Sequence, residues 1–397
     1  MIPFDTQINF ILFEIPKKNM QSKLPQTGTT IFTIMSSLAA ATGAINLSQG
    51  FPNFSIDNKL KNYVIDALDQ DQVQYAPMPG RLDLRQQIAS KIANQHSLTI
   101  NPDTEITITA GATQAIFTAV AALIATGDEV ILFDPAYDCY DPSIRLFGGK
   151  PIHLKLSFPN YTIDWAELER TITSKTKLII FNNPQNPAGS AWLEEDLKSL
   201  EKITAKFPHL YIISDEVYEH LQYTGIHQSV LKSDLLRSRS FVTYSFGKTF
   251  HVTGWKIGYC IAPPEFTKEF RKVHQFNVFC VNNSMQFALA KYLELHDEWK
   301  QLSSFYQAKR DLFQKAMTSS NFKPLTCQGT YFCLYDYSAI SAEKDTDFAI
   351  RLTKEIGVAT IPVSVFYSDF TDHKVIRICF AKTDELLLQA AKKLCKI

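Results

Sequence analysis

Residues 240–259 read SFVTYSFGKTFHVTGWKIGY. An apolar run at 240–244 leads directly into Ser-Phe-Gly-Lys, and a second lysine follows within Gly-Trp-Lys-Ile-Gly. A lysine that stays protonated in water requires no such setting. A lysine that must act as a nucleophile needs burial or nearby positive charge to lower its pKa. Lys248 is therefore a candidate nucleophile, although a lone lysine at a strand end is far more often a solvated side chain.

The stretch is part of a longer alternating pattern. Between about residues 105 and 262, the apolar runs EITIT, EVILF, KLIIF, LYIIS and SFVTY alternate with longer amphipathic segments. Buried strands separated by helical patterns predict βαβ crossovers and a mostly parallel sheet covered on both faces. After about residue 290 the pattern changes to long helical stretches with a few strands. The sequence thus predicts an α/β fold with a smaller α+β domain.

These changes in pattern place the expected domain boundaries. Residues 1–23 are expected to form a disordered extension, and residues 24–50 an arm that joins the small domain. The large domain is expected at 51–290 and the small domain at 291–397.

Composition excludes several functional classes. The 397 residues carry 40 basic and 40 acidic side chains, a balance that argues against a nucleic-acid partner. The cysteines are odd in number, seven, and never form CxxC, which indicates reduced thiols of a cytoplasmic protein and no metal site. No apolar run is long enough to cross a membrane, and the first nineteen residues lack the features of a signal peptide. Small molecules are the expected partners.

In open α/β sheets, ligands bind beyond the carboxyl ends of the strands. Asp215 follows LYIIS, and a buried carboxylate there requires a cation, such as the protonated pyridine nitrogen of pyridoxal phosphate. A helix N-cap is the alternative. Tyr218, one turn later, and Asn186 in NPQNPAG can both reach the phenolic oxygen of that ring, where donors stabilise its anion. Simple packing and a plain loop are their alternatives.

A phosphate site is predicted at AGAT, which opens a helix directly after EITIT. The backbone N–H groups of Gly111, Ala112 and Thr113, together with the helix dipole, form an anion site. Ser245 and Lys256 would add a hydroxyl and a positive charge. Many strand-to-helix turns contain glycine and bind nothing, so this motif alone is weak.

Two further residues have a chemical interpretation and a structural alternative. Tyr137 in DPAYDCY can stack on a flat cofactor ring, or simply pack in the core. Arg377 lies inside the apolar strand KVIRICFA and must pair with something. A substrate carboxylate suits its two-pronged geometry, and a structural salt bridge is the alternative, which this feature alone slightly favours.

Taken in order, seven motifs of the chain resemble the class I/II aminotransferases of the fold-type I pyridoxal-phosphate family. They are G-A-T, P-A-Y, N-P-x-N-P-x-G, D-E-x-Y, S-x-G-K, G-W-K-x-G-Y and R-I-x-F-A. INLSQGFPNF, QYAPMPG and the opening stretch look most like the bacterial methionine aminotransferases and their kynurenine and glutamine transaminase K relatives. The similarity covers about residues 24–397. It implies a mostly parallel, seven-stranded sheet.

The resemblance implies a role for each candidate. Lys248 would form the Schiff base with pyridoxal 5'-phosphate, and Arg377 with the backbone of Gly50 would hold the substrate carboxylate. A homodimer is implied, in which Tyr75 reaches the phosphate of the neighbouring subunit. Asp215 would face the pyridine nitrogen, and Tyr137 would stack on the ring. Asn186 and Tyr218 would bind the phenolic oxygen, and Asn186 would also contact the substrate. Phe32 and Phe279 would line the side-chain pocket, with Phe279 contributed across the subunit interface.

The implied reaction is transfer of an amino group from a hydrophobic or sulfur-containing amino acid, methionine favoured, to a 2-oxo acid by a ping-pong mechanism. A cysteine-conjugate C–S β-lyase would use the same cofactor and remains open. A dinucleotide-dependent dehydrogenase is disfavoured because no GxGxxG follows a first strand. A non-enzymatic pyridoxal-phosphate-binding regulatory module would require an attached DNA-binding domain, for which the chain leaves no room.

Overall fold

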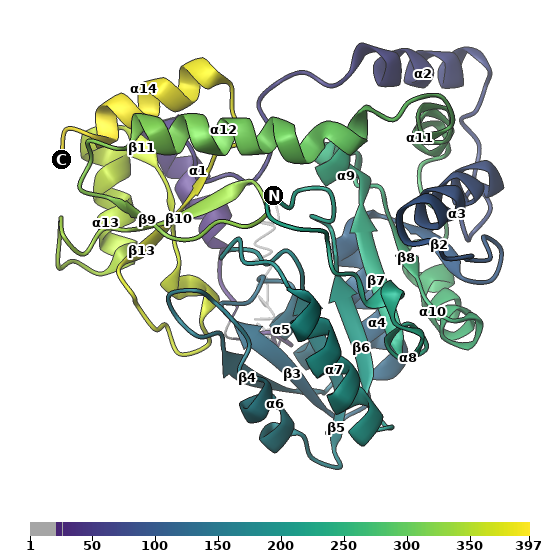
Figure 1. Cartoon of the computed structure of the whole chain (residues 1–397). Coiled ribbons are helices and arrows are strands. Elements are labelled where there is room, and N and C mark those ends of the chain that lie inside the picture. The colour runs from purple at the N-terminus through teal and green to yellow at the C-terminus, as the bar shows by residue number, and fades with distance from the viewer. Residues whose placement is uncertain (1–20, 26) are drawn as a thin grey trace, which may run out of the picture.

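The computed structural model of the chain describes residues 21–25 and 27–397, so the predicted N-terminal extension lies almost wholly outside the described residues. A large sheet with helices on both faces occupies one side of the molecule, and a smaller sheet with its own helices occupies the other (Figure 1). The predicted α/β fold with a smaller α+β part is confirmed.

The large sheet has seven strands in the order β2-β8-β7-β6-β5-β3-β4. Strand β8 is antiparallel to both of its neighbours, whereas β7, β6, β5, β3 and β4 pair in parallel. The strands are β2 (Ile106–Thr109), β3 (Glu129–Asp134), β4 (Lys150–Lys155), β5 (Thr176–Asn182), β6 (Tyr211–Asp215), β7 (Ser240–Ser245) and β8 (Gly258–Ile261).

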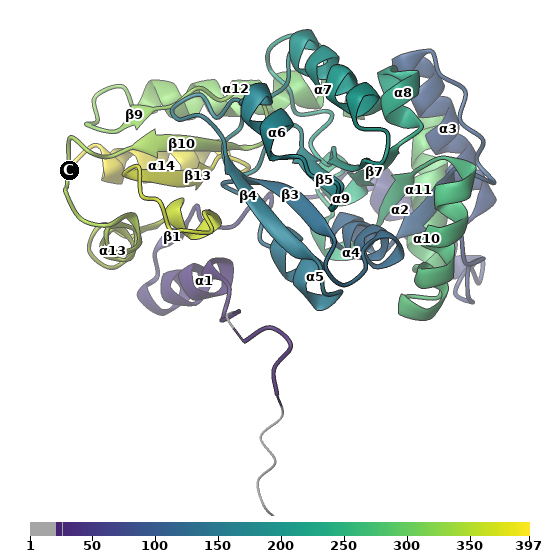
Figure 2. The ribbon, with the colours of Figure 1, turned by 90° about the horizontal axis from the view of Figure 1, so that it is seen from below.

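Helices cover both faces of this sheet, which explains why its strands are continuous apolar runs. Figure 2 shows α6, α7 and α8 over one face and α4 and α5 over the other. The helices of this part are α2 (Asn58–Asp69), α3 (Leu82–His96), α4 (Gly111–Leu123), α5 (Tyr140–Leu146), α6 (Trp165–Thr171), α7 (Glu194–Lys206), α8 (Asp234–Arg237), α9 (Phe246–Thr249), α10 (Pro264–Asn277) and α11 (Asn283–Leu295).

The smaller part is built on a four-stranded antiparallel sheet in the order β12-β13-β10-β9. Its strands are β9 (Lys323–Pro324), β10 (Phe332–Asp336), β12 (Ile361–Pro362) and β13 (Val375–Cys379), and its helices are α12 (Leu302–Ala316), α13 (Asp345–Arg351) and α14 (Asp384–Leu394).

The N-terminal arm packs against this smaller part. Helix α1 (Ile31–Thr42) buries Met35 against Ile361 and Phe366. Strand β1 (Ile45–Asn46) then pairs in parallel with β11 (Val358–Ala359). The first and last thirds of the chain therefore meet. From this contact the segment after β1 runs towards the large sheet.

The boundary expected at residue 290 falls inside α11, a continuous helix that packs against α2 and α3. The helix that the expected boundary crosses ends at Leu295. Sequence periodicity located the change of pattern but not the helix end, because the helical pattern continues with little interruption into α12.

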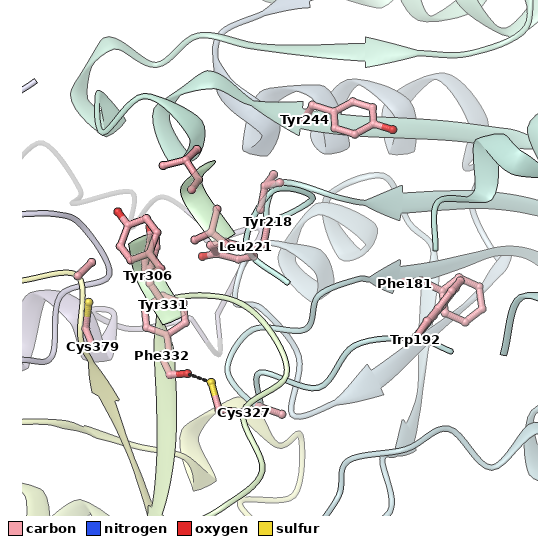
Figure 3. Packing of buried hydrophobic residues seen from close by; sticks show 14 of the residues in the cluster. Phe181, Trp192, Tyr218, Leu221, Tyr244, Tyr306, Cys327, Tyr331, Phe332 and Cys379 are labelled. Carbon is pink, nitrogen blue, oxygen red and sulfur yellow. Dashed lines mark hydrogen bonds between the residues drawn. The ribbon is translucent and has the colours of Figure 1, made fainter. Parts of the chain in front are cut away.

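One apolar core runs between the two parts. In Figure 3, Tyr218 and Leu221, which follow β6, face Tyr306, Tyr331 and Phe332 from the smaller part. No helix of the described residues is long and apolar enough to span a membrane.

Candidate active site

A cavity of about 310 Å³ lies where the carboxyl ends of β5, β6 and β7 meet the smaller part, a volume within the usual range for small-molecule sites. Most residues singled out from the sequence line it. These are Phe32, Gly50, Gly111, Ala112, Thr113, Tyr137, Asn186, Asp215, Tyr218, Ser245, Lys248, Lys256 and Arg377. Convergence is expected because parallel strands end at one edge of a sheet.

Lys248 lies in the short helix α9, directly after β7. Its Nζ is 5.7 Å from the ring centroid of Tyr218 and 5.6 Å from that of Tyr331. Burial, with the nearby charge of Lys256, lowers the pKa of Lys248 to about 8. Part of the amine is therefore neutral near pH 7 and most of it above pH 8, as a nucleophile or general base requires.

The chain turns back immediately after Lys248 because Gly247 has no side chain. A Cβ on Gly247 would lie 2.9 Å from Cα of Thr253. This close approach of two backbone segments returns the chain to the cavity, where Lys256 has a left-handed conformation with φ of 53°. Positive φ at a lysine is uncommon and clusters at functional sites.

Lys256 and the start of α4 face the same point. A Cβ on Gly111, whose φ is 78°, would lie 3.3 Å from Nζ of Lys256. The first N–H groups of a helix lack intrahelical acceptors and carry the positive end of its dipole. An ammonium group, the helix start and the side chain of Ser245 thus surround one part of the cavity, and this donor set fits a phosphate.

Asp215 ends β6 and is buried. Tyr140 donates a 2.6 Å hydrogen bond to its Oδ2, and the backbone N–H of Val217 donates to Oδ1 at 3.4 Å. Burial nevertheless raises the pKa of Asp215 to about 6. A cationic ring nitrogen in the cavity would favour the ionised carboxylate, so the site fits a protonated pyridine.

Arg377 in β13 is buried and its guanidinium lies 4.0 Å from the ring centroid of Phe332. Nη1 donates to Oδ1 of Asn186 at 2.7 Å, and Nη2 donates to the carbonyl of Ser48 at 3.0 Å. Both acceptors are neutral, unlike the carboxylate of the alternative salt bridge. Nε is buried and has no partner within residues 21–25 and 27–397. Such a cation fits an incoming carboxylate.

Because Oδ1 of Asn186 accepts from Arg377, its amide nitrogen is the group left to donate into the cavity. Burial also raises the pKa of Tyr218 well above its ordinary value, so its hydroxyl stays protonated and can donate. Both side chains can therefore donate to a phenolic oxygen.

Tyr75 and Phe279 do not line this cavity. They pack edge to face on each other with ring centroids 5.2 Å apart, and their exposed fractions are 81% and 44%. The expectation that both residues complete the site of a second subunit stays a prediction.

Tyr140, Asn182 and Phe332 are among the residues of the site that were not anticipated. Tyr140 orients Asp215, and its only signal was its place three residues after Tyr137. Asn182 donates to the backbone carbonyl of Asp215 at 2.9 Å and accepts from the N–H of Asn186 at 2.6 Å. Its signal in the sequence was its place as the first residue of NNPQNPAG. Phe332 lies within an ordinary apolar strand, so no local pattern marked it.

Comparison with known proteins supplies the family. The sequence model of a family described as aminotransferase class I and II matches residues 42–394. The chain belongs to this family. It is therefore a transaminase of the fold-type I class, whose cofactor is pyridoxal 5'-phosphate.

Individual relatives are similar along nearly their whole length. The methionine aminotransferase of Escherichia coli strain K12 is 46% identical over 376 residues, covering 94% of this chain and 97% of that enzyme. A kynurenine–oxoglutarate transaminase of Dictyostelium discoideum is 34% identical, covering 93% and 94%. The crystal structure of Escherichia coli YbdL, described as having a methionine aminotransferase function, superposes with a TM-score of 0.93 at 46% identity, covering 96% of this chain and 100% of that chain.

Proposed function

We propose that this transaminase takes the amino group of a hydrophobic or sulfur-containing L-amino acid, with methionine favoured, and transfers it to a 2-oxo acid in two half-reactions. The observation that carries the proposal is that Lys248, with its lowered pKa, and Arg377, with two neutral acceptors and an unpaired Nε, line one cavity. A base and a carboxylate site are what removal of a Cα proton from an amino acid requires.

Bound pyridoxal 5'-phosphate supplies an electron-withdrawing ring that stabilises negative charge at the substrate Cα. Lys248 would hold the cofactor through Nζ and, as the neutral amine, would take up the Cα proton of the substrate. Asp215 would accept a hydrogen bond from the protonated ring nitrogen, and Tyr140 keeps that carboxylate oriented. Asn186 and Tyr218 would donate to the phenolic oxygen, and Tyr137 would stack on the ring.

The N–H groups of Gly111, Ala112 and Thr113 at the start of α4 would hold the phosphate, together with Ser245 and Lys256. Arg377 and the backbone of Gly50 hold the substrate carboxylate, which orients the Cα–H bond towards Lys248.

Neutral side chains suit the remaining space. Among the described residues that line the cavity, the charged ones are Asp215, Lys248, Lys256 and Arg377, and the cofactor and the substrate carboxylate occupy all four. Within the described part of the chain, no lining cation would then be left for a second carboxylate of the substrate. Phe32, Phe51 and Phe332 supply apolar surface instead, which favours methionine-like side chains.

We also propose a cytoplasmic homodimer in which Tyr75 and Phe279 of each subunit complete the site of the other. Support comes from their exposure and from their position outside the cavity of their own chain. Residues 51–295 would form the large domain, and the remaining described residues the small domain with the N-terminal arm.

The test is a visible absorption spectrum of the holoenzyme mixed with L-methionine alone. We expect methionine to remove the visible absorption band of the bound cofactor. Addition of a 2-oxo acid should restore that band. A band that methionine leaves unchanged would refute methionine as donor. Release of ammonia and pyruvate from a cysteine conjugate without any added 2-oxo acid would favour the C–S β-lyase instead.

A further inference from the structure

A buried lysine that does not line the cavity contacts the backbone on either side of Gly50. Lys382 follows β13 and is 3% exposed. Its Nζ donates to the carbonyl of Phe51 at 2.7 Å and to that of Gln49 at 3.4 Å, and it lies 5.0 Å from the ring centroid of Phe51. Burying an ammonium group is costly unless its donors are satisfied. Here its hydrogen-bond acceptors are the carbonyls on either side of Gly50.

These bonds belong to a set that holds the whole loop from residue 47 to residue 53. Its donors come from β13, from the turn that follows it, and from the residue before β10. The acceptor and donor pairs are Leu47 O with Cys379 N (2.9 Å), Ser48 O with Arg377 Nη2 (3.0 Å), Gln49 O and Phe51 O with Lys382 Nζ, Gly50 O with Tyr331 Oη (2.7 Å), and Asn53 Oδ1 with Thr383 N (2.8 Å).

The direction of the Gly50 N–H follows from the planarity of the peptide bond. The carbonyl of Gln49 and the N–H of Gly50 belong to one rigid planar group and point in opposite directions when the bond is trans. A donor that holds the Gln49 carbonyl therefore also sets the direction of the Gly50 N–H. Gly50 cannot be replaced cheaply here, because a Cβ would lie 2.7 Å from the ring of Phe332.

Gly50 lines the cavity together with Arg377, and Arg377 itself holds the neighbouring carbonyl of Ser48. We propose that Lys382 is a positioning residue that holds the Gly50 loop so that its N–H and Arg377 bind the substrate carboxylate together. The proposal rests on the proposed function, in which these two groups take the carboxylate. Lys382 acts only through the loop and touches neither substrate nor cofactor.

The test compares Lys382→Met with the wild-type holoenzyme. The probe is 4-(methylthio)butanoate, which is methionine without its amino group, so its binding reports the carboxylate site without turnover. We expect the Kd of the probe to rise about tenfold in Lys382→Met. Loss of a hydrogen bond from a charged donor changes a binding free energy by about the amount that a tenfold change in Kd represents. The rate at which hydroxylamine, which has no carboxylate, removes the cofactor band should stay within about twofold of the wild-type rate, because Lys382 does not contact the cofactor site.

Lys309→Met is the matched control. Lys309 also has a largely buried side chain, lies 5.3 Å from the ring centroid of Phe54, the residue that follows this loop, and pairs with Asp384 at 2.9 Å. It makes no contact with the carbonyls beside Gly50, so its Kd for the probe should match that of the wild type. If Lys382→Met does not fold, Lys382→Gln takes its place, because it also removes the charge.

An unchanged Kd in the Lys382 variant overturns the proposal. An equal loss of probe binding and of the hydroxylamine reaction also overturns it, because that result indicates a general structural role. A wild-type holoenzyme that neither binds the probe nor reacts with methionine would refute the proposed function itself, before any variant is compared.

Discussion

Replacement of Asp215 by asparagine is expected to stabilise the cofactor-free protein even though it damages the enzyme. The carboxylate is buried, and the two hydrogen bonds it accepts from Tyr140 and Val217 do not restore an ordinary pKa. Its pKa rises from 3.8 to about 6 because burial disfavours the charged form. Without a cationic ring nitrogen in the cavity, ionisation of Asp215 therefore opposes folding.

The size and sign follow from that shift. The pKa is raised in the folded state, so the destabilisation is absent below pH 3.8, grows as the pH rises towards 6 and is constant above it. A difference of about two pKa units corresponds to about 3 kcal/mol in the free energy of unfolding. Roughly half of it, about 1.5 kcal/mol, develops between pH 5 and pH 8. The asparagine amide needs acceptors of its own, but that cost does not vary with pH.

The assay is urea unfolding of the cofactor-free wild type and Asp215→Asn across this pH range, with Asp69→Asn as control. Asp69 is exposed at the end of α2. The stability difference between wild type and Asp215→Asn should grow by about 1.5 kcal/mol in favour of the variant as the pH rises, while the control shows no such trend. A stability difference that does not change with pH would refute the argument.

Three further predictions concern the cavity. Lys248→Ala should lower turnover of methionine on the order of a thousandfold or more, because it removes both the base and the Schiff-base amine. The variant should still retain cofactor in a dialysis assay. Turnover at the wild-type level would contradict the role of Lys248. The rate at which the cofactor-free enzyme regains its absorption band on addition of pyridoxal phosphate should rise with pH and level off above about 8, since the neutral amine of Lys248 is the nucleophile; levelling only near the ordinary lysine pKa would show that the amine is not perturbed. Lys256→Met should weaken cofactor binding about tenfold in a fluorescence titration, because the phosphate loses one charged donor beside the start of α4, and an unchanged affinity would place the phosphate elsewhere.

The strand ends of the large sheet could be predicted because each is marked locally. A buried parallel strand is a continuous apolar run, and the residues that follow it necessarily lie at one edge of the sheet. Lys248, Asp215, Asn186 and Gly111 each come directly at or after such a run, so their convergence on one cavity followed from topology alone.

The partners of Arg377 could not be found in the same way. A strand pattern shows that an arginine is buried, but not whether its acceptor is a carboxylate or, as the structure shows, an amide and a peptide carbonyl. The end of α11 at Leu295 was likewise not marked in the sequence, because helical periodicity continues almost unbroken across it.

By itself, then, the sequence determined the layer order of the large part, the chemistry at its strand ends and the kind of cofactor they suit, since all three depend on residues close together in the chain. Only the tertiary structure decided how Tyr140 orients Asp215 and how Lys382 holds the loop of Gly50. The latter bond joins residues 331 positions apart. Periodicity reports which side chains are buried, whereas the identity of the donor that meets each buried acceptor depends on how distant segments pack together.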